Sequence, residues 1–230
     1  MAGASPNAFK TGALKSKIMN LAQTSVYQVK LQPPPNVLNF LRKKRGLDYT
    51  QRGENIELLC HQTTLPGTSF STTETTNDYA GVTERMIYRR MFDSTIDMTF
   101  YVDKAYDVVE FFEGWVDYMS GMNADNPNNP DMRENFRSSA SFYRMNYPST
   151  YRTPIHVTKF EKNLTDAALT YEFVDAFPLN IISIPVSYEQ SDVLKMSVSF
   201  AYTRYVRSRS RQGLLNNYGE FFKPKGPNAS

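Results

Sequence analysis

Alternation of apolar and polar residues is the strongest pattern along this chain. Within residues 192–205, every second side chain from Leu194 to Tyr202 is apolar, and the positions between them are short or polar. Residues 95–102 repeat the pattern, with isoleucine, methionine, phenylalanine and valine between threonine, aspartate and tyrosine. A period of two is typical of strands with one buried and one wet face. Both segments are predicted strands, and the longer would reach about 40 Å when extended.

Further strands are predicted at residues 25–31, 56–60, 85–92, 152–161 and 168–178. The prolines after the first of them end it, because proline lacks the N–H that a sheet ladder needs. Two insertions, at about 33–54 and 120–140, are polar and are expected to be loops. Residues 68–83, rich in Thr and Ser, form a long excursion between strands. Such a length is uncommon in a compact domain and usually indicates a partner.

One substantial helix is predicted at about 104–120. Its apolar residues recur at spacings of three and four and form a stripe that must be buried: Val108, Phe111, Phe112, Trp115 and Met119. Asp103 is a candidate N-cap and Gly121 a candidate end. The helix carboxylates fall opposite the stripe and are interpreted as a solvated face: Asp107, Glu110, Glu113 and Asp117. A shorter amphipathic helix is predicted at 12–22.

The elements together predict a mainly β protein. They include six to eight strands without the βαβ rhythm of a parallel sheet. The expected fold is an antiparallel β-sandwich or curved sheet, flanked by the 104–120 helix, with the short helix at the N-terminus. The apolar face of the last strand would complete the core: Leu194, Met196, Val198 and Phe200. A single domain at 1–206 is expected, followed by an extension at 207–230.

Composition narrows the class of protein. The 230 residues, 40% of them hydrophobic, suffice for one packed core. No apolar run approaches the roughly 18 residues that span a bilayer, and no secretion signal is apparent. We therefore expect no membrane association. The single cysteine, Cys60, excludes a disulfide within the chain.

Charge is divided unevenly along the chain behind a net value of +3. Residues 1–54 carry nine Lys and Arg against two Asp and Glu, residues 55–205 carry 12 against 20, and residues 206–230 carry five against one. Two interpretations stay open. The basic ends bind nucleic acid, or they join oppositely charged surfaces of other copies of the chain.

Recognisable catalytic chemistry is missing from the sequence. The two histidines fit no zinc pattern, and no phosphate-binding glycine loop or nucleophile elbow occurs. We expect no enzyme activity, no cofactor and no metal. Basic residues at 42–45 and near the C-terminus resemble phosphate-binding patches, so a nucleic-acid-binding protein is an alternative.

The order of several segments resembles the tail tube proteins of contractile-tailed bacteriophages, which are related to the Hcp tube of type VI secretion. The resemblance covers about residues 14–206, with insertions. Its most specific parts are Leu65-Pro66-Gly67 after a strand, the strand-to-helix passage with Phe112 and Trp115, and the segment from "FP" at 177–178 through "ISIPVSYEQSDVLKMSVSFAYTRY".

This resemblance implies a structural virion protein that forms stacked hexameric rings around a channel for DNA. Long strands from neighbouring subunits would make one continuous β-barrel around the channel. Candidates for the channel lining are Thr95, Asp97, Thr99, Lys195, Ser197, Ser199 and Thr203. Alternation alone does not decide which face looks inward. An acidic central segment would keep DNA phosphates from sticking.

The resemblance also implies partners. They are further copies of the chain and the sheath, baseplate or tail-terminator proteins of the same virion, assembled in the cytoplasm of the host bacterium. DNA would pass without specific binding. Candidates for contact between subunits are Thr72, Thr73, Asp78, Tyr79, Arg207, Arg209, Arg211, Phe221 and Phe222. The 207–230 extension is expected to dock on a neighbouring subunit. An alternative with the same fold is the baseplate ring that initiates the tube.

Overall fold

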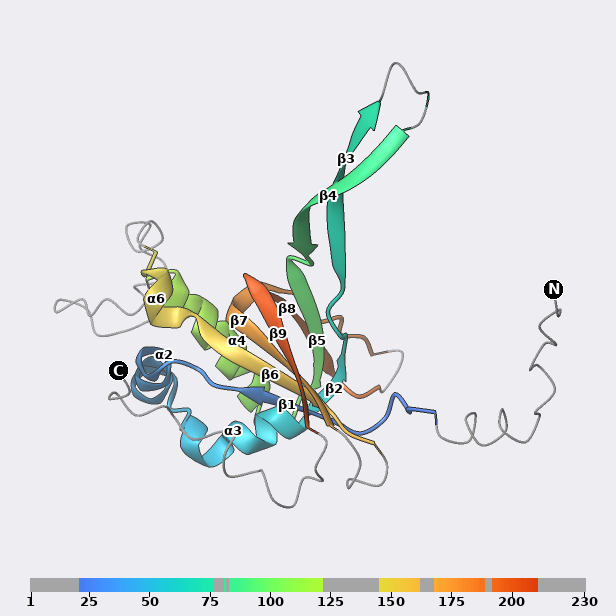
Figure 1. Cartoon of the computed structure of the whole chain (residues 1–230). Coiled ribbons are helices and arrows are strands. Elements are labelled where there is room, and N and C mark those ends of the chain that lie inside the picture. The colour runs from blue at the N-terminus through green and yellow to red at the C-terminus, as the bar shows by residue number, and fades with distance from the viewer. Residues whose placement is uncertain are drawn as a thin grey trace. The chain divides into compact units, whose positions relative to one another are not determined.

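The computed structural model describes residues 21–76, 81, 83–121, 145–161, 168–188 and 192–210 (Figure 1). Two compact units are present, and the larger comprises residues 28–158 and 170–208. In the smaller unit, the N–H of Phe160 donates to the carbonyl of Val26 at 3.0 Å. The predicted helix at 12–22 and the loop at 120–140 lie almost wholly outside the described residues.

The described strands form an antiparallel sheet and a separate hairpin. The sheet has seven strands, in the order β1-β6-β7-β8-β5-β2, with β9 also paired to β7. Their bounds are β1 Tyr27–Leu31, β2 Cys60–Thr63, β5 Thr95–Tyr101, β6 Thr153–Lys159, β7 Ala168–Ile181, β8 Lys195–Ala201 and β9 Arg204–Ser210. Strands β3 (Thr68–Thr76) and β4 (Thr83–Phe92) make the hairpin. The prediction of a mainly β, antiparallel fold is confirmed.

Helix α4 (Asp107–Met119) covers one face of this sheet. The ring of Phe112 packs against Phe100 of β5 and Phe200 of β8, with centroids 4.9 and 5.8 Å away. The side chains in this layer are fully buried: Val108, Phe111, Phe112, Trp115, Met196, Val198 and Phe200. Leu194, just before β8, is half-buried. The predicted stripe is therefore the core contact between helix and sheet.

Helix α4 begins three residues later than predicted. Tyr106 precedes it with a left-handed backbone (φ 60°), and the Asp107 N–H donates to the Asp103 carboxylate at 2.9 Å. The Asp103 carboxylate, four residues before Asp107, thus accepts from a backbone N–H that has no partner within the helix. Gly121 follows the helix at φ 80°, where a glycine carries little backbone strain.

The strand predicted at 192–205 is interrupted. Strand β8 ends at Ala201, β9 begins at Arg204, and Tyr202 between them is buried against the Phe173 ring at 4.9 Å. The facing strand β7 has a left-handed residue at Asp175 (φ 57°). An irregularity of this kind breaks the ladder and bends the chain. The prediction of one long strand at 192–205 is therefore wrong. The longest described strand is β7, with 14 residues.

The insertion expected as a loop at 33–54 is helical instead. It contains α2 (Pro35–Phe40), the π-helical turn η2 (Leu41–Arg45) and α3 (Tyr49–Leu58). Apolar side chains of these helices are buried: Val37, Phe40, Leu41 and Ile56. Gly114 of α4 permits this packing, because a side chain there would collide with Leu41. Burial against α4 stabilises turns that are too short to be helical alone.

The prediction of a strand at residues 56–60 is wrong for residues 56–58. They form the last turn of α3 rather than a strand, and Leu58 is 77% exposed. Strand β2 begins only at Cys60. A short apolar run does not by itself distinguish a strand from a buried helical turn, so the neighbouring packing decided this segment.

Two arginines join the inserted helices to the acidic side of α4. Arg45 contacts Glu110 at 2.8 Å and also Asp117, and Arg52 contacts Asp107 at 2.6 Å. Burial raises the pKa of the Asp117 carboxyl, and the Arg45 guanidinium opposes that rise. The interpretation of these carboxylates as a solvated face is thus wrong for Asp107 and Asp117, each 17% exposed, whereas Glu110 stays 42% exposed although it pairs with Arg45. Part of the basic N-terminal charge neutralises the acidic centre within one chain.

A half-buried carboxylate links α3 to the edge of the sheet. Glu57 Oε1 accepts hydrogen bonds from the Leu31 N–H at 2.7 Å and the Tyr49 hydroxyl at 3.0 Å. The Tyr49 ring stacks on Phe111 at 5.1 Å. Burial raises the pKa of Glu57, although the two donors act against this rise. Folding therefore disfavours the ionised form of Glu57 relative to its protonated form.

Replacing Glu57 by glutamine is expected to make stability less dependent on pH. In the native chain, the contribution of Glu57 to the free energy of unfolding is largest at pH values below the ordinary pKa of glutamate. This contribution falls as pH rises through the elevated pKa of Glu57 in the folded chain. Glu57→Gln keeps an oxygen acceptor and cannot ionise. The free energy of unfolding of the variant, relative to the native chain, should therefore increase from about pH 4.5 to about pH 7.5 in urea titrations. Glu113→Gln, at an exposed position of α4, is the matched control. A relative stability that decreases over this range would contradict the expectation.

Candidate functional site

Small and polar side chains occupy the face of the sheet opposite α4. On β5, Thr95 and Asp97 are exposed and Thr99 is half-buried; on β8, Lys195 is exposed and Ser197 and Ser199 are half-buried: these are six of the seven candidate lining residues. The register sets Thr99 opposite Ser197 and Asp97 opposite Ser199. The seventh candidate, Thr203, is exposed but lies in the break between β8 and β9.

These side chains bind one another across the two strands. The hydroxyls of Thr99 and Ser197 are 2.9 Å apart, and the Ser199 hydroxyl donates to Asp97 Oδ1 at 2.5 Å. Lys195 Nζ lies 5.5 Å from the centre of the Tyr101 ring. The two charges on this part of the face, Asp97 and Lys195, have opposite signs. The contacts among the side chains of β5 and β8 leave a polar surface made largely of short side chains, with little net charge.

The polar face continues across β6 and β7. The hydroxyls of Thr158 and Thr170 are 3.1 Å apart on the side of β6 opposite the buried Ile155 and Val157. His156 shares that side, and burial lowers its pKa while the nearby Glu172 acts in the opposite direction. The polar surface therefore spans four strands in sequence, β6, β7, β8 and β5. We call it the polar sheet face.

Three acidic residues of the central segment lie on the other side of the sheet from the polar sheet face. Asp107, Glu110 and Asp117 belong to α4, on the other side of the sheet, and contact Arg52 or Arg45. These carboxylates therefore lie on the α4 side, opposite the candidate lining residues, and the expectation that acidic residues line a channel stays a prediction. Sequence charge counts do not distinguish the two faces of a sheet.

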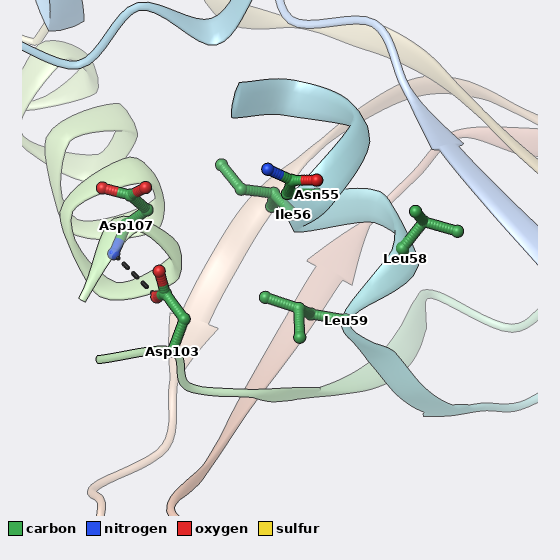
Figure 2. A pocket seen from close by; sticks show the side chains of 6 residues that line it. All are labelled: Asn55, Ile56, Leu58, Leu59, Asp103 and Asp107. Atoms are coloured by element: carbon green, nitrogen blue, oxygen red, sulfur yellow. Dashed lines mark hydrogen bonds between the residues drawn. The ribbon is translucent and has the colours of Figure 1, made fainter. Parts of the chain in front are cut away.

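A pocket of about 320 Å³ lies where the end of α3 meets the start of α4. Figure 2 shows Asp103 and Asp107 on one side, facing Ile56 and Leu59 on the other. Both carboxylates already accept hydrogen bonds, from the Asp107 N–H and from Arg52. The lining contains no nucleophile or base in contact with them, so the pocket provides no basis for catalysis. Among the described residues no cluster of metal-binding side chains occurs.

The β3–β4 hairpin extends away from the sheet (Figure 1). The hairpin includes most of residues 68–83, which were expected to form an excursion between strands. That expectation is corrected, because β3 pairs with β4 along nine positions. Thr72 and Thr73 are exposed on β3, and Asp78 and Tyr79 lie outside the described residues. Cross-strand pairing stabilises this Thr-rich strand, although it has no apolar period.

Apolar side chains of the hairpin are exposed, and sequence reasoning missed them as contact candidates. They are Phe70, Met86, Ile87, Tyr88 and Met91. The sequence "RMIYRRMF" indicates this exposure. It carries apolar residues on both faces of the strand, and the strand before it has almost no apolar residues to pack against them. At the base, the Arg90 guanidinium lies 4.7 Å from the Phe92 ring, which packs on Tyr205 at 5.3 Å. Several exposed apolar side chains on one projecting element indicate a binding surface.

The C-terminal contact candidates divide between described and undescribed residues. Arg207 and Arg209 are exposed within β9, so the expected extension begins inside a strand. Arg211, Phe221 and Phe222 lie outside the described residues. The division into a domain at 1–206 and a docking extension stays a prediction.

Comparison with known proteins assigns the family. The model of the family described as phage tail tube protein matches residues 22–208. The chain belongs to the phage tail tube protein family. It is accordingly a structural component of a phage tail and not an enzyme. In the described part of this tail tube protein, no helix has both the length and the apolar character needed to cross a membrane.

Several solved structures resemble this tail tube protein at low identity. The tube-terminating cap of the anti-feeding prophage has 12% identity and a TM-score of 0.48, covering 83% of this chain and 92% of the other. The sheath-tube complex of the PVC extracellular contractile injection system has 11% identity and a TM-score of 0.46, covering 85% and 96%. An Hcp protein has 11% identity and a TM-score of 0.34, covering 80% and 98%. No curated protein matches the chain. The family assignment rests on the match over residues 22–208.

Proposed function

We propose that this tail tube protein forms hexameric rings that stack into the tube of a contractile phage tail, through which DNA enters the host. The observation that supports this most directly is the polar sheet face. A channel wall must be wet, smooth and unable to hold the passing phosphates. On β5 and β8 the polar sheet face has short side chains that bind one another, and its two charges there, Asp97 and Lys195, are of opposite sign.

Closure of the wall requires neighbouring copies. Strands β1 and β2 lie at the two ends of the strand order, and β2 has only four residues. Unpaired strand edges favour further pairing, and a barrel removes them by joining each sheet to the next. In this arrangement the polar sheet face looks into the channel. The α4 side looks outward, towards sheath, baseplate or terminator proteins of the virion.

Electron microscopy of the purified chain over a range of concentrations tests the proposal. Stacked rings with a central hole are the expected result. Rings that never extend would favour the baseplate initiator over the repeating tube subunit, and monomers at every concentration would contradict the proposal. A chain ending at Ser210 should assemble less well in the same experiment, because we propose that residues 207–230 dock on a neighbouring subunit.

A charge on the exposed hairpin is expected to impair assembly without unfolding the subunit. Ile87 is 65% exposed, so Ile87→Glu should change the free energy of unfolding by less than about 0.5 kcal/mol. Burying that charge between subunits would raise the concentration needed for assembly at least about tenfold. Sedimentation and electron microscopy measure this concentration. Ser149→Glu, at an exposed position outside the hairpin, is the matched control. Unchanged assembly of Ile87→Glu would show that the apolar surface is not an interface.

A further inference from the structure

The β3–β4 hairpin joins the sheet through two short connections. Residues 64–67 lead from β2 into β3, and Asp93 and Ser94 lead from β4 into β5. A few residues at the ends of two elements are enough to act as a hinge, because they can absorb a large change in backbone angles. Contacts between side chains are therefore needed to fix the direction of the hairpin relative to the sheet.

Arg90, on β4 near the base of the hairpin, makes such contacts with three strands. Its guanidinium lies 4.7 Å from the centre of the Phe92 ring on β4 and 5.7 Å from the centre of the Tyr205 ring on β9. Its Nε donates to the Thr68 hydroxyl of β3 at 3.0 Å, and that hydroxyl donates to the Met91 carbonyl at 3.0 Å. The Arg90 side chain thus connects both strands of the hairpin to the sheet.

Tyr205 is anchored in the sheet and not in the hairpin. It lies on β9, which pairs with β7, and its ring packs on Tyr171 of β7 with centroids 5.7 Å apart. The Phe92 ring meets the Tyr205 ring edge-on at 5.3 Å. A cation above an aromatic ring and two rings packed edge to face are both attractive arrangements. Arg90, Phe92 and Tyr205 therefore form one group of contacts, which we call the hairpin latch.

Two backbone hydrogen bonds hold the connections themselves. Asp93 Oδ2 accepts from the Gly67 N–H at 2.7 Å and so joins one connection to the other. The Ser94 carbonyl accepts from the Tyr202 N–H at 3.3 Å, in the break between β8 and β9. These bonds keep the hinge region close to the sheet, whereas the hairpin latch restrains the hairpin itself.

We propose that Arg90 is a positioning residue, which sets the direction of the β3–β4 hairpin in the free subunit by joining it to Tyr205 of the sheet. Arg90 is exposed and is not part of the buried core, so its replacement should leave the fold intact. The exposed apolar side chains of the hairpin are thereby held in one direction before any partner binds. A surface that is already ordered loses less conformational freedom on binding. The inference goes beyond the proposed function, because it concerns the subunit before assembly.

The geometry of the hairpin latch suits arginine and not lysine. The planar guanidinium lies over two rings and donates from Nε at the same time, whereas the lysine ammonium is a single compact charge without a flat face. Arg90→Lys therefore keeps the charge and removes the hairpin latch. Arg89→Lys is the matched control, because Arg89 is the neighbouring exposed residue of β4 and successive side chains of a strand point to opposite sides.

The distance between two spin labels measures the direction of the hairpin. In a Cys60→Ser background, Thr73→Cys on β3 and Glu113→Cys on α4 place labels at two exposed positions, one on the hairpin and one on the helix that covers the sheet. Labelled chains are diluted with unlabelled chains below the concentration of assembly, so that electron spin resonance reports distances within one subunit. We expect a narrow distance distribution for the native chain and for Arg89→Lys, and one at least about twice as wide for Arg90→Lys. A broad distribution for the native chain, or an equally narrow one for Arg90→Lys, would overturn the inference.

Further variants separate a role in direction from a role in folding. Tyr205→Phe keeps the ring and should keep the narrow distribution, whereas Tyr205→Leu should widen it as much as Arg90→Lys does. Labels at Thr50→Cys on α3 and Glu113→Cys on α4 should keep their distribution in every variant, because neither belongs to the hairpin. Widening of this second distribution by Arg90→Lys would show a loss of folding and overturn the inference, as would a narrow hairpin distribution in Tyr205→Leu. A native chain that never forms rings would contradict the proposed function and leave this measurement unaffected.

Discussion

Phe112→Ala should lower the free energy of unfolding by about 3–5 kcal/mol, the usual loss for truncating a fully buried phenylalanine. The Phe112 ring lies where α4 meets the sheet, 4.9 Å from Phe100, 5.0 Å from Phe111 and 5.8 Å from Phe200, measured between centroids. Removing it loses these contacts and leaves a cavity. A loss of this size is a large share of the roughly 5–15 kcal/mol that stabilises a typical domain.

Urea unfolding monitored by circular dichroism measures this loss. Tyr147→Ala is the control, because Tyr147 is 81% exposed and its truncation should cost less than about 0.5 kcal/mol. Phe112→Leu should lose less than Phe112→Ala, about 1.5 kcal/mol, and it keeps the test informative if the alanine variant does not fold. Similar losses for Phe112→Ala and Tyr147→Ala would contradict the core assignment.

Arg45→Met should lower the free energy of unfolding by about 2–4 kcal/mol at neutral pH, because it leaves Glu110 and Asp117 without their cation. The side chains of Arg45 and Asp117 are only 20% and 17% exposed. Methionine retains the apolar stem that lies near Gly114, so the loss reports on charge more than on volume. Burial already raises the pKa of Asp117, and removing Arg45 should raise it further.

The pH dependence gives this prediction a distinct signature. A carboxylate with an elevated folded pKa loses its stabilising contribution as pH rises from the ordinary aspartate range through the folded value. Arg45→Met should therefore be more destabilising at about pH 7 than at about pH 4. Arg52→Met is the control, because Arg52 is 48% exposed and its pair with Asp107 should contribute about 1 kcal/mol or less. A loss from Arg45→Met that is the same at both pH values would contradict the role of Asp117.

Local periodicity explains why α4 and β5 were predictable. Each carries a pattern whose period matches its backbone geometry, so the buried side of Phe112 or Met98 follows from a few neighbouring residues. The same reasoning identified the alternating residues of β8. It did not predict the break at Tyr202 and Thr203, where the Thr203 N–H donates to the Val174 carbonyl of β7, beside the left-handed Asp175.

The inserted helices show the limit of local reasoning more clearly. The segment around Arg45 is basic and contains several residues typical of loops, and its helices are short. They become stable only because Leu41 packs on Gly114 and Arg45 reaches two carboxylates of α4. Those partners are 65 to 73 residues away along the chain. The segment does contain local helix signals, namely Pro35 in the first turn of α2, the left-handed Gly46 after η2 and the N-cap Asp48 of α3. Those signals do not indicate the distant partners against which the helices pack.

Residue order and period alone were enough to predict the antiparallel β class, the aromatic stripe of α4, the alternating faces of β5 and β8, and the resemblance to tail tube proteins. Each of these depends on residues close together in the chain. Three features became apparent only in the folded chain: which acidic residues are neutralised, where the last strand breaks, and that apolar side chains of the hairpin remain exposed. They depend on which distant residues meet, because burial and charge pairing between such residues arise only when the chain folds.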